Sequence, residues 1–275
     1  MRFSIIIPNY NGGQYLQECL DSIFNQTIDK SKYEVLLIDD GSTDNSLEIA
    51  SKYDVKVFKT NRKKAGGARN KGLDNATGEY ILFLDSDDYF YSHDTLEKLD
   101  NYITDEDSIN LPILKQRKDS VEFLSNNGMT LEEKIEKTGL LACFLRCVKL
   151  DILKDVRFPE NCYFEDIYFT IETFCNVKKE SNFPEPVVFY RYAENSITKQ
   201  TDGNSKRIIS PDKMTDLVMQ IINLYHLCEK YPQYSPYIIS RIKNDSIQLR
   251  LDILNEYFET GYNSFFDNYE KLKRC

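Results

Sequence analysis

The sequence has little of what builds a membrane protein, a zinc site or a disulfide-stabilised fold. No apolar run in its 275 residues approaches the roughly 18 residues of a membrane span. Only two histidines are present, and the seven cysteines, an odd number, include no C-x-x-C pair. This pattern fits reduced thiols in a cytosolic protein better than disulfides or zinc. The first residues enter an apolar segment almost at once, without the pattern of a signal peptide.

A general excess of positive charge is also missing. The formal net charge is −9, so the broad basic surface that binds nucleic acid is not expected. With 41% hydrophobic and 29% charged residues, the chain has the composition of a folded globular protein rather than a disordered one. Its length suits one large domain or two small ones. We find no internal repeat and no low-complexity tract.

Apolar strands and amphipathic helices alternate through the first 85 residues. Strands are predicted at residues 3–7, 34–38, 55–58 and 80–84, and helices at about 16–24, 44–53 and 66–76. This alternation predicts an α/β fold with a doubly wound, mostly parallel sheet. Ligands bind such sheets beyond the carboxyl ends of the strands. Pro8–Tyr10, Asp39-Asp40 and Asp85–Asp87 all fall at such ends, so they could line one crevice.

Three carboxylates in four positions follow the fourth of these strands. Asp85, Asp87 and Asp88 would repel one another at the end of a buried strand unless a counter-ion compensated for their charge. Oxygen ligands without a nearby histidine or cysteine favour Mg²⁺ or Mn²⁺, a cation that is usually shared with substrate phosphates. The alternative for this stretch alone is a solvated acidic turn.

Five positive charges without an intervening acid lie between the third and fourth strands: Arg62, Lys63, Lys64, Arg69 and Lys71. In an acidic protein this local exception suits a diphosphate group. A solvated helix face would account for the same pattern.

A second acidic pair, Glu165-Asp166, is embedded in aromatic residues: Tyr163, Phe164, Tyr168 and Phe169. Such surroundings can desolvate a carboxylate and raise its pKa toward that of a general base. The alternative is a helix N-terminus, where acidic side chains are favoured by the helix dipole.

The rest of the chain is predicted in outline. We expect a strand at 108–114, a helix at 131–154 that carries Cys143 and Cys147 on one face, a β-prone segment at 187–192 and a polar linker at 201–210. From Pro211 onward the pattern is helical and rich in tyrosine and phenylalanine. Helix packing explains these apolar stripes, while contact with an oligomer partner or a membrane surface remains open.

The order and spacing of several blocks resemble those of bacterial family 2 glycosyltransferases of the GT-A fold. The blocks are Ser4–Asn11, Ile38–Asp44, Gly67–Asn70, Ala76–Tyr80, Asp85–Asp88, Phe158-Pro159 with Glu165-Asp166, and Tyr190-Arg191 with Ser196–Thr198. They extend over roughly residues 1 to 200. The helical tail matches no motif of the family that we can name.

The resemblance implies an inverting, metal-dependent enzyme that moves a sugar from a nucleotide-sugar, expected to be a UDP-sugar, to an acceptor hydroxyl in surface polysaccharide or glycan biosynthesis. Mn²⁺ or Mg²⁺ is the implied cofactor. By position, the donor-binding residues would be Pro8, Tyr10, Asn11, Asp40, Lys64, Arg69, Asp85, Ser86 and Asp87. Asp40 would contact the nucleobase of the donor, and Asp87 and Asp85 of the D-x-D element would hold the metal. Asp166 would be the general base, with Glu165 beside it as the alternative.

The resemblance also divides the chain. Residues 1–105 would form the nucleotide-sugar-binding half of the GT-A domain, residues 106–205 its acceptor and catalytic half, and residues 206–275 a C-terminal helical extension. The expected partners are a nucleotide-sugar donor and a glycan or lipid-linked acceptor. The expected location is the cytoplasm, with peripheral contact at the inner face of the membrane. Homo-oligomer formation through the C-terminal helices is compatible with this picture.

Other functions remain open from the sequence. A nucleotidyltransferase uses the same carboxylates, metal and phosphates but releases pyrophosphate. The acceptor could also be a protein or a nucleic-acid base, and a sugar-nucleotide-binding scaffold is the non-enzymatic alternative. A hydride-transferring Rossmann enzyme is disfavoured because G-x-G-x-x-G is absent after the first strand.

Overall fold

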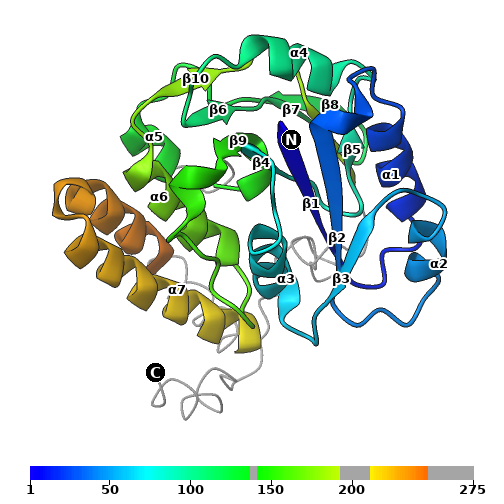
Figure 1. The fold of residues 1–275 in the computed structure, drawn as a ribbon. Helices are drawn as coiled ribbons and strands as arrows, with labels where there is room; N and C mark the ends of the chain where they lie inside the picture. The colour runs from blue at the N-terminus through cyan, green and yellow to red at the C-terminus, as the bar shows by residue number, and fades with distance from the viewer. Residues whose placement is uncertain (137–140, 193–210, 247–275) are drawn as a thin grey trace.

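The structure, a computed structural model, describes residues 1–136, 141–192 and 211–246 (Figure 1). Its main sheet has seven strands in the order β10-β6-β9-β4-β1-β2-β3. The bounds are β1 (Phe3–Asn9), β2 (Tyr33–Asp39), β3 (Lys56–Lys59), β4 (Tyr80–Phe83), β6 (Ser108–Asn110), β9 (Arg146–Lys149) and β10 (Glu180–Asn182). All neighbours run parallel except β9, which is antiparallel to both β4 and β6. The predicted α/β class with a mostly parallel sheet is confirmed.

Helices cover both faces of this sheet, which explains why its central strands are apolar without alternation. Ile5 and Ile7 of β1 pack in one core cluster with α1 (Leu16–Phe24), whereas Ile6 belongs to the cluster on the other face with α3 (Lys64–Leu73). The other helices are α2 (Ser46–Ala50), α4 (Thr95–Tyr102), α5 (Leu131–Glu136), α6 (Glu165–Asn176) and α7 (Pro211–Lys230), with short 3-10 segments η1 (Lys30–Lys32), η3 (Cys143–Leu145), η4 (Leu150–Leu153) and η5 (Pro232–Tyr234).

A second, four-stranded sheet extends from the acidic loop. Its order is β5-β11-β7-β8, with β5 (Tyr89–Phe90), β7 (Ile113–Gln116), β8 (Val121–Leu124) and β11 (Val188–Tyr190). β11 pairs antiparallel with β5 and parallel with β7. The segment predicted as one strand at 108–114 is therefore two strands, β6 and β7, which belong to different sheets. The prediction of a β-prone segment at 187–192 is met by β11.

The predicted helix at 131–154 is wrong over most of its length. Among the residues of this segment that the structure describes, which leave out 137–140, only those of α5 are α-helical. The chain from residue 143 onward forms η3, the strand β9 and η4. Cys143 and Cys147 therefore do not share a helix: Cys147 lies in β9, paired opposite Leu82. The run from residue 140 to 153 is apolar at nearly every second and third position, so its pattern fits a buried helix and a buried strand equally well. Pairing with β4 and β6 decides the outcome.

The C-terminal helices form a third layer. α7 lies beside α6, and helical residues 235–246 complete the layer (Figure 1). Leu224 and Leu227 of α7 and Ile238 pack with Ile171 and Phe174 of α6 in a separate core cluster. The predicted helical region from Pro211 is thus confirmed as far as residue 246. The predicted linker at 201–210, the Ser196–Thr198 block and the chain from 247 onward lie outside the described residues. No helix among the described residues is long and apolar enough to cross a membrane.

Candidate active site

Three strand ends bring the predicted site residues to one edge of the main sheet. β1 lies between β2 and β4, with Asn9 paired opposite Asp39 and Ile6 paired opposite Phe83. Because all three strands are parallel, the residues that follow them emerge on the same side. The structure therefore brings the loops after Pro8, Asp39 and Leu84 together, as the sequence predicts.

The loop after β1 is fitted between the other two loops. The backbone N–H of Asn11 donates to Ser42 Oγ at 2.9 Å, and Asn11 Oδ1 accepts from the backbone N–H of Thr43 at 2.8 Å. On the other side, a Cβ added at Gly12 would lie 2.8 Å from Ser86 Oγ. Glycine at this position lets the backbone approach the acidic loop closely.

Asp40 forms a buried carboxylate beside an exposed aromatic ring. Its Oδ1 accepts from Thr60 Oγ1 at 2.7 Å and from the backbone N–H of Lys63 at 2.9 Å. Next to it, the Arg62 guanidinium lies 4.3 Å from the centroid of the Tyr10 ring, which is 45% exposed. A flat ring with a cation stacked on it, close to a carboxylate, is suited to a planar nucleobase. The sequence placed Arg62 only in a basic cluster, without a partner.

Arg69 joins the acidic loop to the second acidic pair. Its Nη2 lies 2.7 Å from Asp85 Oδ1 and its Nη1 lies 2.6 Å from Glu165 Oε1, and the residue is only 5% exposed. Buried guanidinium–carboxylate bonds are short and directional, so the two carboxylates are held at fixed positions. The predicted contact of Arg69 with a donor stays a prediction. What the structure shows is that Asp85 and Glu165 meet through it.

Close backbone packing supports this bridge. A Cβ added at Gly66 of α3 would lie 2.3 Å from the Pro159 carbonyl oxygen, so α3 can approach the segment before α6 only because this residue is glycine. Asn70 then donates from Nδ2 to the Phe158 carbonyl oxygen and accepts at Oδ1 from the Phe158 N–H, both at 2.9 Å. Asn70 belongs to one of the sequence blocks, and its role is to fasten α3 to the chain that leads to Glu165-Asp166.

Asp166 is the second residue of α6. Burial, and after it the charge of Glu165, raise the pKa of Asp166 to about 7, although the Arg69 cation opposes the rise. A helix N-terminus alone would lower the pKa of an acidic side chain. The desolvating surroundings therefore outweigh the helix end at this position, and a carboxylate with such a pKa can accept a proton near neutral pH.

The acidic loop itself forms a compact carboxylate cluster. One carboxylate oxygen each from Asp85, Asp87 and Asp88 lie within 4.8 Å of one another. Asp88 is 2% exposed, and its buried Oδ2 has no hydrogen-bond partner in the part of the chain that the structure describes. Burial, then Asp87 and Asp85, raise the pKa of Asp88 well above its ordinary value. An orphaned oxygen among repelling acids fits a hard divalent cation. Asp88 is thus a third candidate ligand, beside the predicted Asp85 and Asp87.

Lys64 is tied to the C-terminal layer. Its Nζ lies 3.2 Å from Asp216 Oδ2 on α7 and 3.8 Å from the centroid of the Tyr163 ring. The same Asp216 oxygen accepts from the backbone N–H of Tyr163 at 2.8 Å. The sequence gave no signal for Asp216, because it lies in no motif and more than 150 residues from Lys64.

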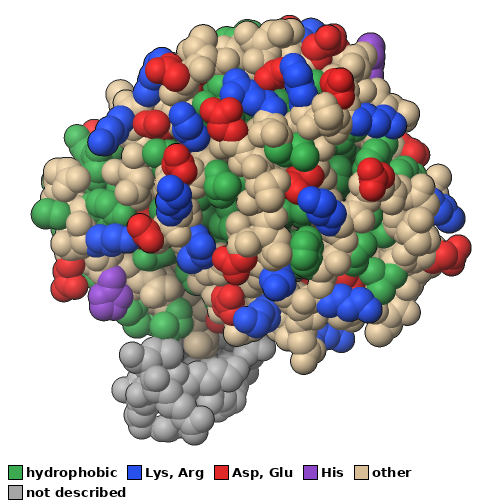
Figure 2. All heavy atoms as spheres, in the orientation of Figure 1, with side chains coloured by type: hydrophobic (Ala, Val, Ile, Leu, Met, Phe, Trp, Pro, Cys, Tyr) green, Lys and Arg blue, Asp and Glu red, His purple; other side chains and the backbone are tan. Residues whose placement is uncertain are grey.

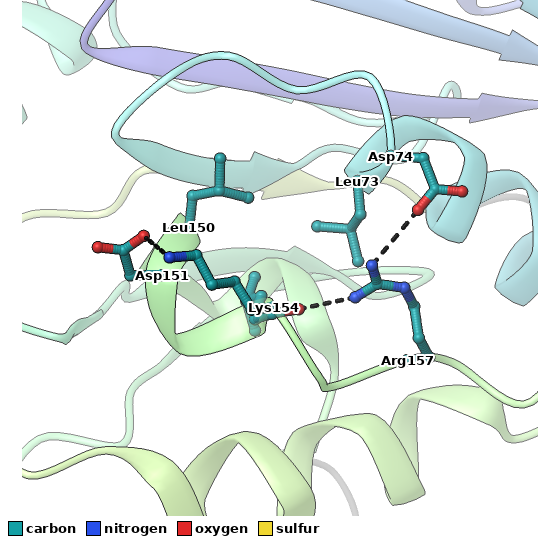
Figure 3. Close-up of a pocket in the computed structure, with 7 residues that line it drawn as sticks. Leu73, Asp74, Leu150, Asp151, Lys154 and Arg157 are labelled. Atoms are coloured by element: carbon teal, nitrogen blue, oxygen red, sulfur yellow. Dashed lines mark hydrogen bonds and ion pairs between the residues drawn. The ribbon is translucent and has the colours of Figure 1, made fainter.

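A surface pocket lies at the opposite edge of the sheet (Figure 3). Leu73, Asp74, Leu150, Asp151, Leu153, Lys154 and Arg157 line it. Register places Tyr80, the first residue of β4, opposite Lys149, just before η4, so the pocket is remote from the strand ends that carry the acids. In Figure 3 the Arg157 guanidinium turns to Asp74 and the Lys154 ammonium turns to Asp151, at 3.4 and 2.9 Å. Its cations are engaged in local ion pairs, and the pocket is not the candidate site.

The chain belongs to glycosyl transferase family 2. The family model, "Glycosyl transferase family 2", matches residues 4–146, which is more than half of the chain. This match contains the acidic loop, Arg69 and the loops after β1 and β2. The predicted family is confirmed.

Several relatives carry names from teichoic acid biosynthesis. The chain is 30% identical over 237 residues to poly(ribitol-phosphate) beta-N-acetylglucosaminyltransferase TarS of Staphylococcus aureus (strain MW2), a match of 81% of this chain and 40% of that protein. It is 31% identical over 254 residues to the minor teichoic acid biosynthesis protein GgaB of Bacillus subtilis (strain 168), a match of 86% and 28%. The chain thus spans less than half the length of either relative.

A solved structure supports the fold. S. aureus TarS 1–349 in complex with UDP-GlcNAc is similar with a TM-score of 0.67 and 28% sequence identity, over 82% of this chain and 66% of that one. The predicted GT-A fold with C-terminal helices is therefore confirmed.

Proposed function

We propose that the protein transfers a sugar from a UDP-sugar to a hydroxyl group of a cell-surface polymer of the teichoic acid type, with inversion at the anomeric carbon. The observation that carries this proposal is the Arg69 bridge, which fixes Glu165, and with it Asp166, beside the acidic loop. Glycosyl transfer requires a binding site for the diphosphate and a proton acceptor close to it. The names of TarS and GgaB support the polymer class.

The donor would occupy the crevice from the β1 and β2 ends to the β4 end. The nucleobase of the donor would lie beside Tyr10, Arg62 and Asp40. Its diphosphate would lie beside Asp85, Asp87 and Asp88. A divalent cation bound by these carboxylates supplies Lewis-acid neutralisation of the charge that develops on the departing nucleoside diphosphate. Lys64, which is only partly buried, can exchange the Asp216 carboxylate for a phosphate oxygen.

Asp166 would carry the proton transfer. Its carboxylate accepts the proton of the acceptor hydroxyl while the oxygen of that hydroxyl attacks the anomeric carbon from the face opposite the diphosphate. The new C–O bond forms as the bond to the β-phosphate oxygen breaks, and UDP leaves with the electron pair. Glu165, held by Arg69, orients the first turn of α6 and keeps the pKa of Asp166 high.

The remaining assignments belong to this proposal. Residues 1–105 bind the donor, residues 106–205 bind the acceptor and carry the base, and residues 206–275 extend the fold with helices. The acceptor would be met at the cytoplasmic face of the membrane. Charges of both signs are interspersed on the face seen in Figure 2, without a continuous basic patch, which argues against nucleic acid as the acceptor on that face.

A donor panel tests the proposal. Purified protein is offered a series of nucleotide-sugars with Mn²⁺ or Mg²⁺, and the release of nucleoside diphosphate is measured with and without EDTA. We expect release from a UDP-sugar, stimulated by a ribitol-phosphate polymer and abolished by EDTA. Release of pyrophosphate would instead indicate a nucleotidyltransferase, and donor binding without any release would indicate a scaffold.

Asp166→Asn tests the base. We expect this variant to bind UDP-sugar with nearly unchanged affinity and to lose transfer by about a hundredfold or more, since general bases contribute on the order of 10² to 10⁴ in rate. Asp151→Asn, at the opposite sheet edge, is the matched control and should behave as the wild type. Transfer close to the wild-type rate in Asp166→Asn would remove Asp166 from the role of base.

A further inference from the structure

Arg191, the first residue after β11, makes two hydrogen bonds to the acidic loop. Its backbone N–H donates to Asp88 Oδ1 at 2.8 Å, and its side-chain Nε donates to the backbone carbonyl oxygen of Asp87 at 2.9 Å. One bond therefore holds a carboxylate and the other holds the main chain of the neighbouring residue. The loop residues and Arg191 are more than 100 positions apart in the chain.

The guanidinium of Arg191 is itself held from three directions. Its Nη2 lies 2.6 Å from Glu18 Oε2 on α1, and its central carbon lies 4.8 Å from the Tyr15 ring centroid and 5.3 Å from the Tyr89 ring centroid. A planar guanidinium that is paired with a carboxylate and lies close to two aromatic rings has few alternative orientations. The donor that reaches Asp87 is thus fixed by groups from α1 and β5.

We propose that Arg191 is a positioning residue for the metal-binding acids, a role that rests on the proposed function. Without a cation, three carboxylates within 4.8 Å of one another repel, and a short loop would relax outward. Arg191 opposes this movement by bonding the loop at two successive residues and by placing a positive charge beside it. The carboxylates are then close to binding geometry before the cation and the diphosphate arrive, so binding costs less reorganisation.

Charge and positioning predict opposite results for one substitution. If Arg191 acted only through its charge, it would compete with the cation, and its removal would strengthen metal binding. If it acts by positioning, its removal weakens metal binding. Lysine keeps the charge but cannot reproduce the planar fork with a donating Nε. Arg191→Met and Arg191→Lys together therefore separate the two effects.

The experiment measures Mn²⁺ binding in the presence of UDP by calorimetry for the wild type, Arg191→Lys and Arg191→Met, with thermal unfolding of each protein alongside. We expect both variants to bind Mn²⁺ at least about tenfold more weakly while the unfolding temperature changes little. Arg157→Lys and Arg157→Met are the matched controls, because Arg157 pairs with Asp74 at the opposite edge of the sheet. They should bind Mn²⁺ as the wild type does.

Three results would overturn the assignment. Stronger Mn²⁺ binding by Arg191→Met with unchanged binding by Arg191→Lys would mean that only charge matters. Lower unfolding temperatures with unchanged Mn²⁺ affinity of the folded protein would mean a purely structural role. Absence of Mn²⁺-dependent UDP binding in the wild type would remove the metal from the proposed function and the role of Arg191 with it, a failure that the wild-type measurement identifies by itself.

Discussion

Arg69 is the residue through which the two acidic motifs of the chain meet. It sits on α3, whose preceding residue Lys63 donates its backbone N–H to Asp40. A single helix therefore links Asp40, beside which we propose that the nucleobase binds, to the bridge between Asp85 and Glu165 further along. Because the guanidinium is buried and doubly paired, its charge is a fixed part of the site.

Burial and, after it, the charge of Glu165 predict the pH dependence of the proposed transfer. Since the pKa of Asp166 is raised to about 7, the carboxylate form increases as the pH rises through that value, and kcat/KM should rise with it. Glu165→Gln removes a like charge and leaves Arg69 to act on Asp166, so both changes lower the pKa of Asp166. We expect the acidic limb of the kcat/KM profile to move to lower pH.

Initial rates of UDP release from about pH 5 to about pH 9 would measure this shift. Glu160→Gln, close in sequence and paired with Lys63 at the surface, serves as the control and should leave the limb in place. A limb that stays unmoved, or moves to higher pH, in Glu165→Gln would contradict the coupling between the two acids.

Arg146 is a buried cation with poor compensation. It is 1% exposed, its three side-chain nitrogens have no hydrogen-bond partner in the described ranges, and its guanidinium lies 4.1 Å from the centroid of the Phe174 ring. Burial lowers the pKa of Arg146 to about 10. Replacing a poorly paired buried ion by an apolar side chain is often stabilising, by up to about 4 kcal/mol.

We therefore expect Arg146→Met to raise the unfolding temperature. Thermal unfolding at neutral pH measures the change, with Arg157→Met as a surface control that should differ little from the wild type. A fall in the unfolding temperature of Arg146→Met would show that the cation has a compensating partner.

At the scale of elements, Glu34 joins three strands at the amino edge of the sheet. Its carboxylate accepts from Ser4 Oγ of β1 at 2.6 Å, from the Thr77 N–H at 2.7 Å and from Lys56 Nζ of β3 at 2.7 Å. Burial alone would raise the pKa of Glu34, but these hydrogen bonds outweigh it and lower the pKa to about 2. The edge opposite the active site is thus fastened by one ionised side chain.

The lowered pKa of Glu34 makes stability depend on pH. The folded state binds this proton less tightly than the unfolded state, so the contribution is complete above the ordinary value of 4.5 and is lost as the pH falls through about 2. We expect Glu34→Gln to lower the free energy of unfolding by about 1.5 to 3 kcal/mol at pH 7, the usual loss for hydrogen bonds to a charged group.

Urea unfolding at neutral and acidic pH tests this expectation. The difference between the wild type and Glu34→Gln should shrink as the pH drops below about 4. Glu48→Gln removes an exposed pair with Lys52 and should have little effect at either pH. A difference that stays constant over this range would contradict the role of the ionised carboxylate.

The elements that the sequence predicted well are those fixed by local pattern. The first four strands are found within about two residues of their predicted bounds, because each is an apolar run between clear turn residues. β9 was missed because its four residues become a strand only by pairing with β4 and β6, which are far away in the chain. The position of the strand ends, and so the placement of Asp40 and Asp85 on the same side of the sheet, followed from the parallel order alone.

The partners of the site residues were beyond the reach of the sequence. The acidic and basic residues of the site could be identified from the sequence. No local sequence pattern shows that Arg69 pairs with Glu165, 96 positions away, or that Arg191 donates to Asp87. Asp216 lies on a helix whose pattern predicts only packing. Such pairings are set by the topology that brings α3, α6 and α7 together.

At the scale of the whole molecule, the C-terminal layer depends on its own core cluster. Leu224 of α7 is fully buried there and Tyr225 beside it is exposed. We expect Leu224→Ala to cost about 2 to 5 kcal/mol, because the cavity left behind cannot fully collapse. The loss should appear first as opening of α7, since β1 and β2 belong to other clusters.

Hydrogen exchange distinguishes local from global opening. Amides of α7 should exchange faster in Leu224→Ala, while those of β1 and β2 keep their protection, and Tyr225→Ala should resemble the wild type. Equal loss of protection in all three elements would mean that the layer does not open as a separate unit.

The position of the antiparallel strand β9 in the sequence also affects how the chain folds while it is being synthesised. β4, which leads into Asp85, has β1 beside it as soon as it is synthesised, but its other edge gains a partner only when residues 146–149 have been added. On the ribosome β4 therefore has one open apolar edge during the whole interval from residue 83 to residue 146. A nascent chain in that state is a target for chaperones and for aggregation, so slow translation in this interval should lower the yield of folded protein.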